Sequence, residues 1–132
     1  NSATQVTTGA LDLQSGSVLA MEIGGLTAGT DFDQIIVPEG GSVDLAGDLD
    51  ISLFDGFNPE LGDEFVLIVF QASDAAITGN FVSVTGDGNW QVSYTGGDGN
   101  DVVASIIPEP TTLSLLGLAL TALLGGRPRR RK

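Results

Sequence analysis

The chain has 132 residues, enough for one small domain and a tail, and it contains no cysteine and no histidine. Disulfides, zinc centres, thiol nucleophiles and Ser-His or Cys-His catalytic pairs are therefore excluded within this sequence. All 17 acidic residues lie at or before Glu109, whereas all 5 basic residues lie within 127–132. An acidic body of this kind repels nucleic acid and anionic lipid headgroups, which leaves divalent cations and neutral glycans as its small partners.

Residues 1–107 are predicted to form an all-β body. Apolar residues alternate in 19–23 and 48–53, which predicts half-buried strands, and shorter strands are expected at 34–37 and 42–45. Gly-Ser-Val occurs twice, at 16–18 and again at 41–43, a recurrence that a solenoid repeat would produce.

The second half of the body continues this pattern. Residues 64–70 form a continuous apolar run, which is consistent with a strand covered on both faces. Further strands are expected at 80–84, 90–94 and 101–107, and no helical period precedes Pro108. Strands at this short, fairly even spacing leave an antiparallel β-sandwich, a barrel or a β-solenoid, and the sequence does not separate solenoid from sandwich because both folds alternate alike.

One glycine-rich segment carries a candidate calcium site. Residues 96–104, GGDGNDVVA, fit the calcium β-roll pattern G-G-x-G-x-D-x-U-x position by position. Asp98, Asn100 and Asp101 would supply the oxygen ligands that Ca²⁺ prefers, and no other cofactor is expected. The same residues also suit a plain hairpin or solenoid turn, so both interpretations stay open.

The acidic residues of the body raise the question of catalysis. Asp31 and Asp33 lie two positions apart, and paired carboxylates hydrolyse glycosides when they are suitably spaced. Acidic side chains at turns more commonly cap backbone N–H groups, so we expect no enzymatic activity in this chain. Because the chain begins at Asn1, we expect the body to be the C-terminal part of a longer protein. The alternative function is therefore the end of a secreted polysaccharide-active enzyme whose catalytic part lies upstream.

The tail predicts a short membrane helix. Residues 111–126 carry no charge, and as a helix they would span about 24 Å, short of the roughly 30 Å hydrocarbon core. Gly117, Thr121 and Gly125 share one face, where small residues permit close helix packing. A cytoplasmic stop follows, since positive charge stays on that side of the membrane, and it comprises Arg127, Arg129, Arg130, Arg131 and Lys132. A permanent tail anchor is the alternative to a transient span.

The residues before the helix are Pro108, Glu109 and Pro110, which the two prolines hold extended. A Pro-Glu-Pro triplet, an apolar helix and an Arg-rich end in this order resemble the PEP-CTERM sorting signal. The resemblance covers 108–132 and implies recognition and cleavage by an exosortase at the inner membrane of a Gram-negative bacterium. It further implies that the body then passes to the cell surface or extracellular matrix.

The body carries a second resemblance, which rests on turns and alternation. The stretch GTDFDQIIVPEGGSVDLAGDLDISLFDGFNPELGDEFVLIV, followed by GNFVSV and WQVSYTGGDGNDVV, is similar to the C-terminal rungs of autotransporter-passenger-like surface proteins. The similarity covers roughly 19–106 and implies a right-handed parallel β-helix whose open ends need caps.

Overall fold

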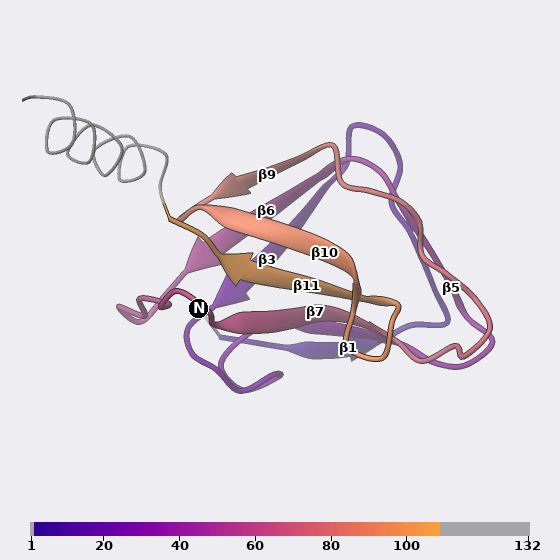
Figure 1. Ribbon diagram of the computed structural model, residues 1–132, viewed down its shortest axis with the longest axis horizontal. Helices are drawn as coiled ribbons and strands as arrows, with labels where there is room; N and C mark the ends of the chain where they lie inside the picture. Colours follow the sequence, from indigo (N-terminus) through magenta and orange to yellow (C-terminus); the bar gives the residue numbers. More distant parts are fainter. Residues whose placement is uncertain (1, 109–132) are drawn as a thin grey trace, which may run out of the picture.

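The computed structural model describes residues 2–108, and in this part of the chain every regular element is a β-strand (Figure 1). The longer alternating and apolar segments of the sequence form strands because each of them buries one face or both. The strands are β1 (Gln5–Thr7), β2 (Ala10–Asp12), β3 (Val18–Ile23), β4 (Gln34–Val37), β5 (Ser42–Leu45), β6 (Asp48–Leu53), β7 (Glu64–Phe70), β8 (Thr78–Gly79), β9 (Ser83–Gly86), β10 (Trp90–Gly96) and β11 (Asp101–Ile106).

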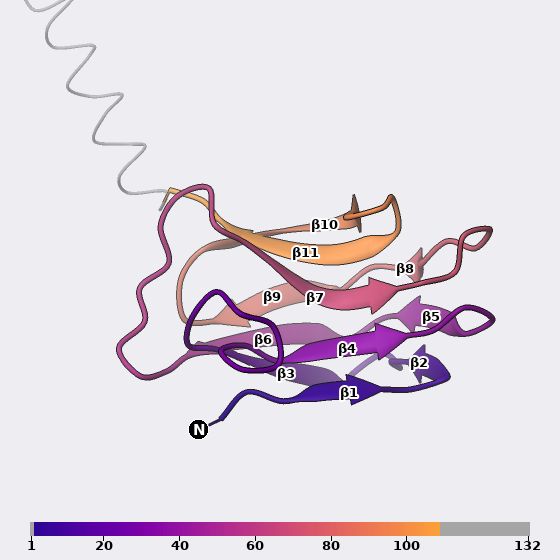
Figure 2. The same cartoon turned by 90° about the horizontal axis from the view of Figure 1, so that it is seen from below.

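Each strand from β1 to β6 pairs in parallel with the strand three places later in the chain. The pairs form β1-β4-β7, β2-β5-β8 and β3-β6-β9, and the successive strands lie above one another in Figure 2. Antiparallel strands β11 and β10 then extend the first sheet in the order β1-β4-β7-β11-β10, so this sheet is mixed and open. The all-β prediction is confirmed, but the antiparallel sandwich is not the arrangement observed in residues 2–108.

The core lies between the three sheets. Phe65 in β7 is fully buried, and its ring makes edge-to-face contacts with Phe32, Phe57 and Trp90 at centroid distances of 5.4, 6.0 and 5.7 Å. Such edge-to-face pairs add to the stabilisation that comes from burying apolar area. Trp90 opens β10, so this aromatic cluster joins the antiparallel end of the first sheet to the parallel strands.

Two glycines allow the third layer of strands to approach the second. Gly79 ends β8 and Gly86 ends β9, both with positive φ. A Cβ atom on Gly79 would lie 2.1 Å from the carbonyl oxygen of Leu45, and one on Gly86 would lie 2.0 Å from that of Ile51. Only glycine combines this backbone conformation with so close an approach.

Several sequence-based predictions of strands need correction. β1, β2 and β8 were not predicted, and the strand expected at 80–84 is instead β9, at Ser83–Gly86. The two Gly-Ser-Val copies are not equivalent, because Val18 pairs with Asp48 in one sheet whereas Val43 pairs with Leu11 in another. Within residues 2–108 no helix is long and apolar enough to cross a membrane, and the helix expected at 111–126 lies outside the described residues.

Candidate processing site at the C-terminal end of the body

The end of the body is tied back onto the turn that precedes β10. Trp90 at the start of β10 pairs with Ile106 at the end of β11. Beyond the strand, the N–H of Ile107 donates to the carbonyl oxygen of Asn89 over 3.0 Å, and Nδ2 of Asn89 donates to the carbonyl oxygen of Pro108 over 3.0 Å. The body is therefore hydrogen-bonded to the chain up to the first residue of the Pro-Glu-Pro triplet.

The turn that carries Asn89 is held by its own contacts. The indole Nε1 of Trp90 donates to the carbonyl oxygen of Asp87 over 2.5 Å, and the carboxylate of Asp87 accepts the N–H of Leu53 over 3.0 Å. Gly88 has φ +84°, and a Cβ there would lie 3.2 Å from Ile106. These contacts fix Asn89 against both β6 and the end of β11.

The remaining residues of the predicted sorting signal lie outside residues 2–108. They are Glu109, Pro110, the proposed packing face Gly117, Thr121 and Gly125, and the basic residues Arg127, Arg129, Arg130, Arg131 and Lys132. Their roles stay predictions.

The glycine-rich segment forms the turn of the β10–β11 hairpin. Gly97 and Gly99 have φ +56° and +116°, and the pairing register shifts between Ser93 and Gly96. Nδ2 of Asn100 donates to the carbonyl oxygens of Ala72 and Ala75, over 2.6 and 3.1 Å, which ties this turn to the segment after β7. These residues also line a cavity of about 380 Å³.

The calcium interpretation of Asp98, Asn100 and Asp101 stays a prediction. Within residues 2–108 no three acidic side chains lie close enough together to hold a metal ion. One carboxylate oxygen of Asp101 already accepts the N–H of Phe70, over 3.0 Å, so this residue has a structural role in the hairpin. A calorimetric titration of the protein with CaCl₂ that showed no binding heat would dismiss the site.

Burial of the Asp101 carboxyl makes the free energy of unfolding depend on pH. Burial raises the pKa of its carboxyl, the N–H of Phe70 opposes this shift, and the negative charge of Asp98 adds to it. Because the pKa in the folded state lies above the ordinary value of 3.8 for an aspartate, the folded protein binds this proton more tightly than the unfolded chain. Stability from this group is therefore present at low pH and is lost as the pH rises through the raised pKa.

We expect Asp101→Asn to reveal this titration. The amide does not titrate, so the variant's free energy of unfolding minus that of the wild type should increase as the pH rises from below 3.8 to 7. Urea unfolding at a series of pH values measures the difference. Asp101→Ala does not titrate either and should show the same dependence on pH, displaced downward by about 1–3 kcal/mol because it leaves the Phe70 N–H without an acceptor. If the difference between Asp101→Asn and the wild type did not change with pH, the raised pKa of Asp101 would be contradicted.

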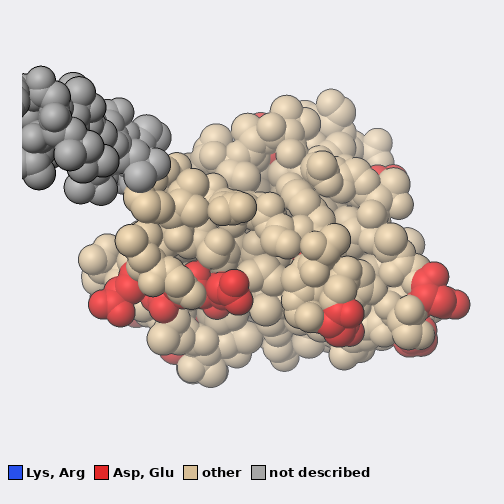
Figure 3. Space-filling model, viewed as in Figure 1, with Lys and Arg blue, Asp and Glu red and all other residues tan. Residues whose placement is uncertain are grey.

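The carboxylates weighed above as catalytic groups accept backbone hydrogen bonds instead. Asp33 accepts the N–H groups of Thr4 and Glu22, both over 2.8 Å, and Asp31 accepts that of Thr27 over 3.1 Å. The two residues precede β4, and neither lies in a strand. Figure 3 shows the acidic side chains in separate patches on one face of the molecule.

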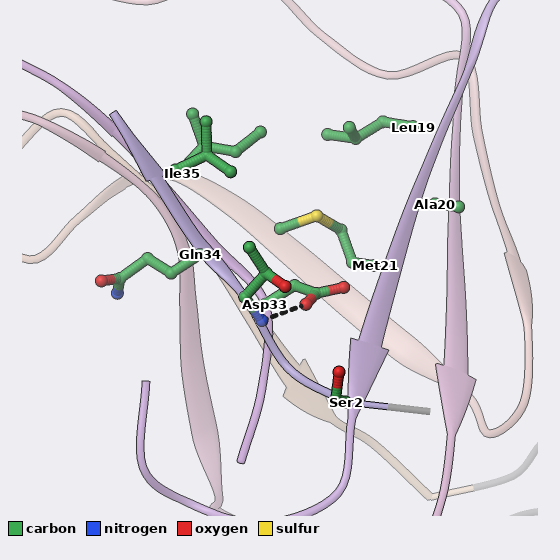
Figure 4. A pocket seen from close by; sticks show the side chains of 9 residues that line it. Ser2, Leu19, Ala20, Met21, Asp33, Gln34 and Ile35 are labelled. Atoms are coloured by element: carbon green, nitrogen blue, oxygen red, sulfur yellow. Dashed lines mark hydrogen bonds between the residues drawn. The ribbon is translucent and has the colours of Figure 1, made fainter. Parts of the chain in front are cut away.

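A shallow cavity of about 290 Å³ lies beside Asp33, between β1, β3 and β4. Its walls include Leu19, Met21 and Ile35, and Figure 4 shows Asp33 at its edge with the hydrogen bond from Thr4 as a dashed line. Gln34 on the same wall is buried and its amide donates to the carbonyl oxygen of Val66 over 2.8 Å. The polar groups here are thus used to hold the strands together.

Comparison with known proteins identifies the C-terminal segment. Residues 107–131 match the family model described as the PEP-CTERM protein-sorting motif. No curated protein and no solved structure matches the chain, so the resemblance of the body to autotransporter passengers gains no support. The match begins at Ile107, where the body's last backbone hydrogen bonds are made. The chain therefore carries a PEP-CTERM sorting motif, which implies export, recognition by an exosortase and processing at the membrane.

Proposed function

We propose that this chain is a non-enzymatic exported protein whose tail is cleaved off by an exosortase and whose body is released to the cell surface or extracellular matrix. The sorting motif at 107–131 is the observation that carries this proposal. The distribution of charge supports it, because every cation lies behind the apolar segment 111–126 and every anion lies in front of it. Positive charge retained in the cytoplasm would place the acidic body on the opposite side of the membrane.

We further propose that the body is a short β-solenoid of three coils. Strands β1 to β3 would form the first coil, β4 to β6 the second and β7 to β9 the third. The parallel pairing of each strand with the one three places later supports this assignment. The antiparallel hairpin β10–β11 would cap the third coil, since an uncovered strand edge invites pairing with another chain.

The use of the carboxylates supports a non-enzymatic body. Asp31, Asp33, Asp87 and Asp101 each accept at least one backbone N–H, so they act as turn and strand caps. In a body with no Lys or Arg, these bonds take the place of salt bridges in holding neighbouring segments together. A neutral glycan such as exopolysaccharide is the partner that its charge would accept.

The proposal is tested by changing the motif beyond the body. We expect the double variant Glu109→Ala, Pro110→Ala to retain its tail, because the Pro-Glu-Pro triplet that the enzyme is expected to recognise is lost. The matched control is Thr111→Ala, Thr112→Ala, which alters the next two residues and leaves the triplet intact. Immunoblots of membrane and medium fractions from cells that express an exosortase measure release. Normal release of the first variant would contradict the proposal.

A further inference from the structure

Asn89 makes one hydrogen bond to Ile107 and one to Pro108, at the start of the sorting motif. One bond uses its backbone and the other its side chain. Its backbone oxygen accepts from Ile107, and its side-chain amide donates to Pro108. Asn89, Ile107 and Pro108 are all half-buried. Together with the pairing of Trp90 and Ile106, these bonds extend the hairpin past the end of β11. We call residues 89, 107 and 108 the junction clamp.

The junction clamp leaves no free linker between the body and the motif. Cleavage of a peptide bond requires an extended and accessible backbone, and the N–H of Ile107 and the carbonyl oxygen of Pro108 are already bonded within the body. An enzyme that engaged these residues would have to open the end of the β10–β11 hairpin. Opening it would also expose Trp90, which is 8 % exposed and contacts Phe65.

We propose that Asn89 is a positioning residue for processing. It protects the peptide bonds up to Pro108 and presents the motif from a fixed point on the body, so that the cut falls on the C-terminal side of Pro108. This inference rests on the proposed function, because it concerns the same cleavage. It adds that the folded body, and not the motif alone, determines where the chain is cut.

The test uses the full chain in cells that express an exosortase. Asn89→Asp keeps the backbone acceptor for Ile107 but removes both side-chain donors to Pro108. Asn89→Ala removes the same bond without adding a charge. Asn80→Asp is the matched control, because it makes the same chemical change at an exposed residue between β8 and β9. Intact mass of the released body gives the C-terminal residue, and pulse-chase labelling gives the rate of tail removal.

We expect the wild-type body to end at one residue, at or after Pro108. Loss of one hydrogen bond should lower the equilibrium constant for the positioned junction about five-fold, so both Asn89 variants should be processed up to about five-fold more slowly and with scattered C-termini. Asn80→Asp should keep the wild-type rate and terminus.

Three results would overturn the inference. The first is a wild-type body that ends at or before Ile107, which is decisive even if no variant folds. The second is an Asn89 variant that is cut at the wild-type rate and position, and the third is an equal effect of Asn80→Asp. A wild-type chain that keeps its whole tail would instead overturn the proposed function, so the two failures are distinguishable.

Discussion

Phe65→Ala is expected to lower the free energy of unfolding by about 3–5 kcal/mol, the range for large-to-small changes of a buried aromatic residue. Phe65 has no exposed surface, and it lies at the centre of the contacts with Phe32, Phe57 and Trp90. Truncation leaves a cavity between three aromatic rings that come from different segments, and such a site collapses poorly. Urea unfolding followed by Trp fluorescence measures the change, because Trp90 is the only tryptophan.

Val82→Ala is the control for this prediction. Val82 is apolar as well, but it is 76 % exposed in the segment between β8 and β9. Its truncation should change the free energy of unfolding by less than about 0.5 kcal/mol. Equal effects of the two substitutions would mean that the aromatic cluster is not the centre of the core.

Asp33→Ala is expected to lower the free energy of unfolding by about 2–4 kcal/mol, since two backbone N–H groups lose a charged acceptor. Those groups belong to Thr4, just before β1, and to Glu22 in β3, so one carboxylate joins the beginning and the end of the first three strands. Asp33→Asn retains one acceptor oxygen and should fall between the wild type and the alanine variant. Urea unfolding measures the free energy of unfolding of the three proteins and so gives their order of stability.

The control for this second prediction is Asp44→Ala. Asp44 is exposed in β5 and lies next to Asp12 in the register, so its removal relieves a like-charge contact instead of breaking a cap. The stability of the Asp44→Ala variant should be equal to or slightly above that of the wild type. If Asp33→Ala were as stable as Asp44→Ala, the capping role of Asp33 would be wrong. Hydrogen exchange at the amides of Thr4 and Glu22 should also accelerate only in the Asp33 variants.

The long strands were predictable because alternation and apolar runs report burial directly. Residues 48–53 alternate and form β6, and the apolar run 64–70 forms β7, which is paired on both sides. β1 and β8 were missed because their residues are exposed in the structure and show no alternation in the sequence. Their positions depend on the strands they pair with, which is information that a local pattern does not contain.

β9 shows a different failure. Phe81, Val82 and Val84 suggested a strand at 80–84, but Phe81 is buried before the strand begins, where its N–H donates to the hydroxyl of Tyr94. The strand therefore begins after Phe81 and runs over Ser83–Gly86. Its pairing with β6 and the conformation of Gly86 determine where it ends. From a single sequence, apolar residues that anchor a loop cannot be distinguished from those that form a strand.

The candidate processing site was likewise predictable from the sequence only in part. The triplet, apolar segment and basic end were evident from the order of residues, and the family match at 107–131 agrees. Asn89 was not predicted, because in a Gly-Asp-Gly-Asn turn it looked like an ordinary turn-former. Its role depends on the antiparallel pairing of β10 with β11, which brings Pro108 beside it.

The most direct test of the account is the intact mass of the exported protein from cells with and without the exosortase. With the enzyme present, we predict a body that lacks 127–132 and ends at or after Pro108; without it, the tail should be retained in the membrane fraction. A mature protein that kept Arg127 to Lys132 in the presence of the enzyme would contradict the account.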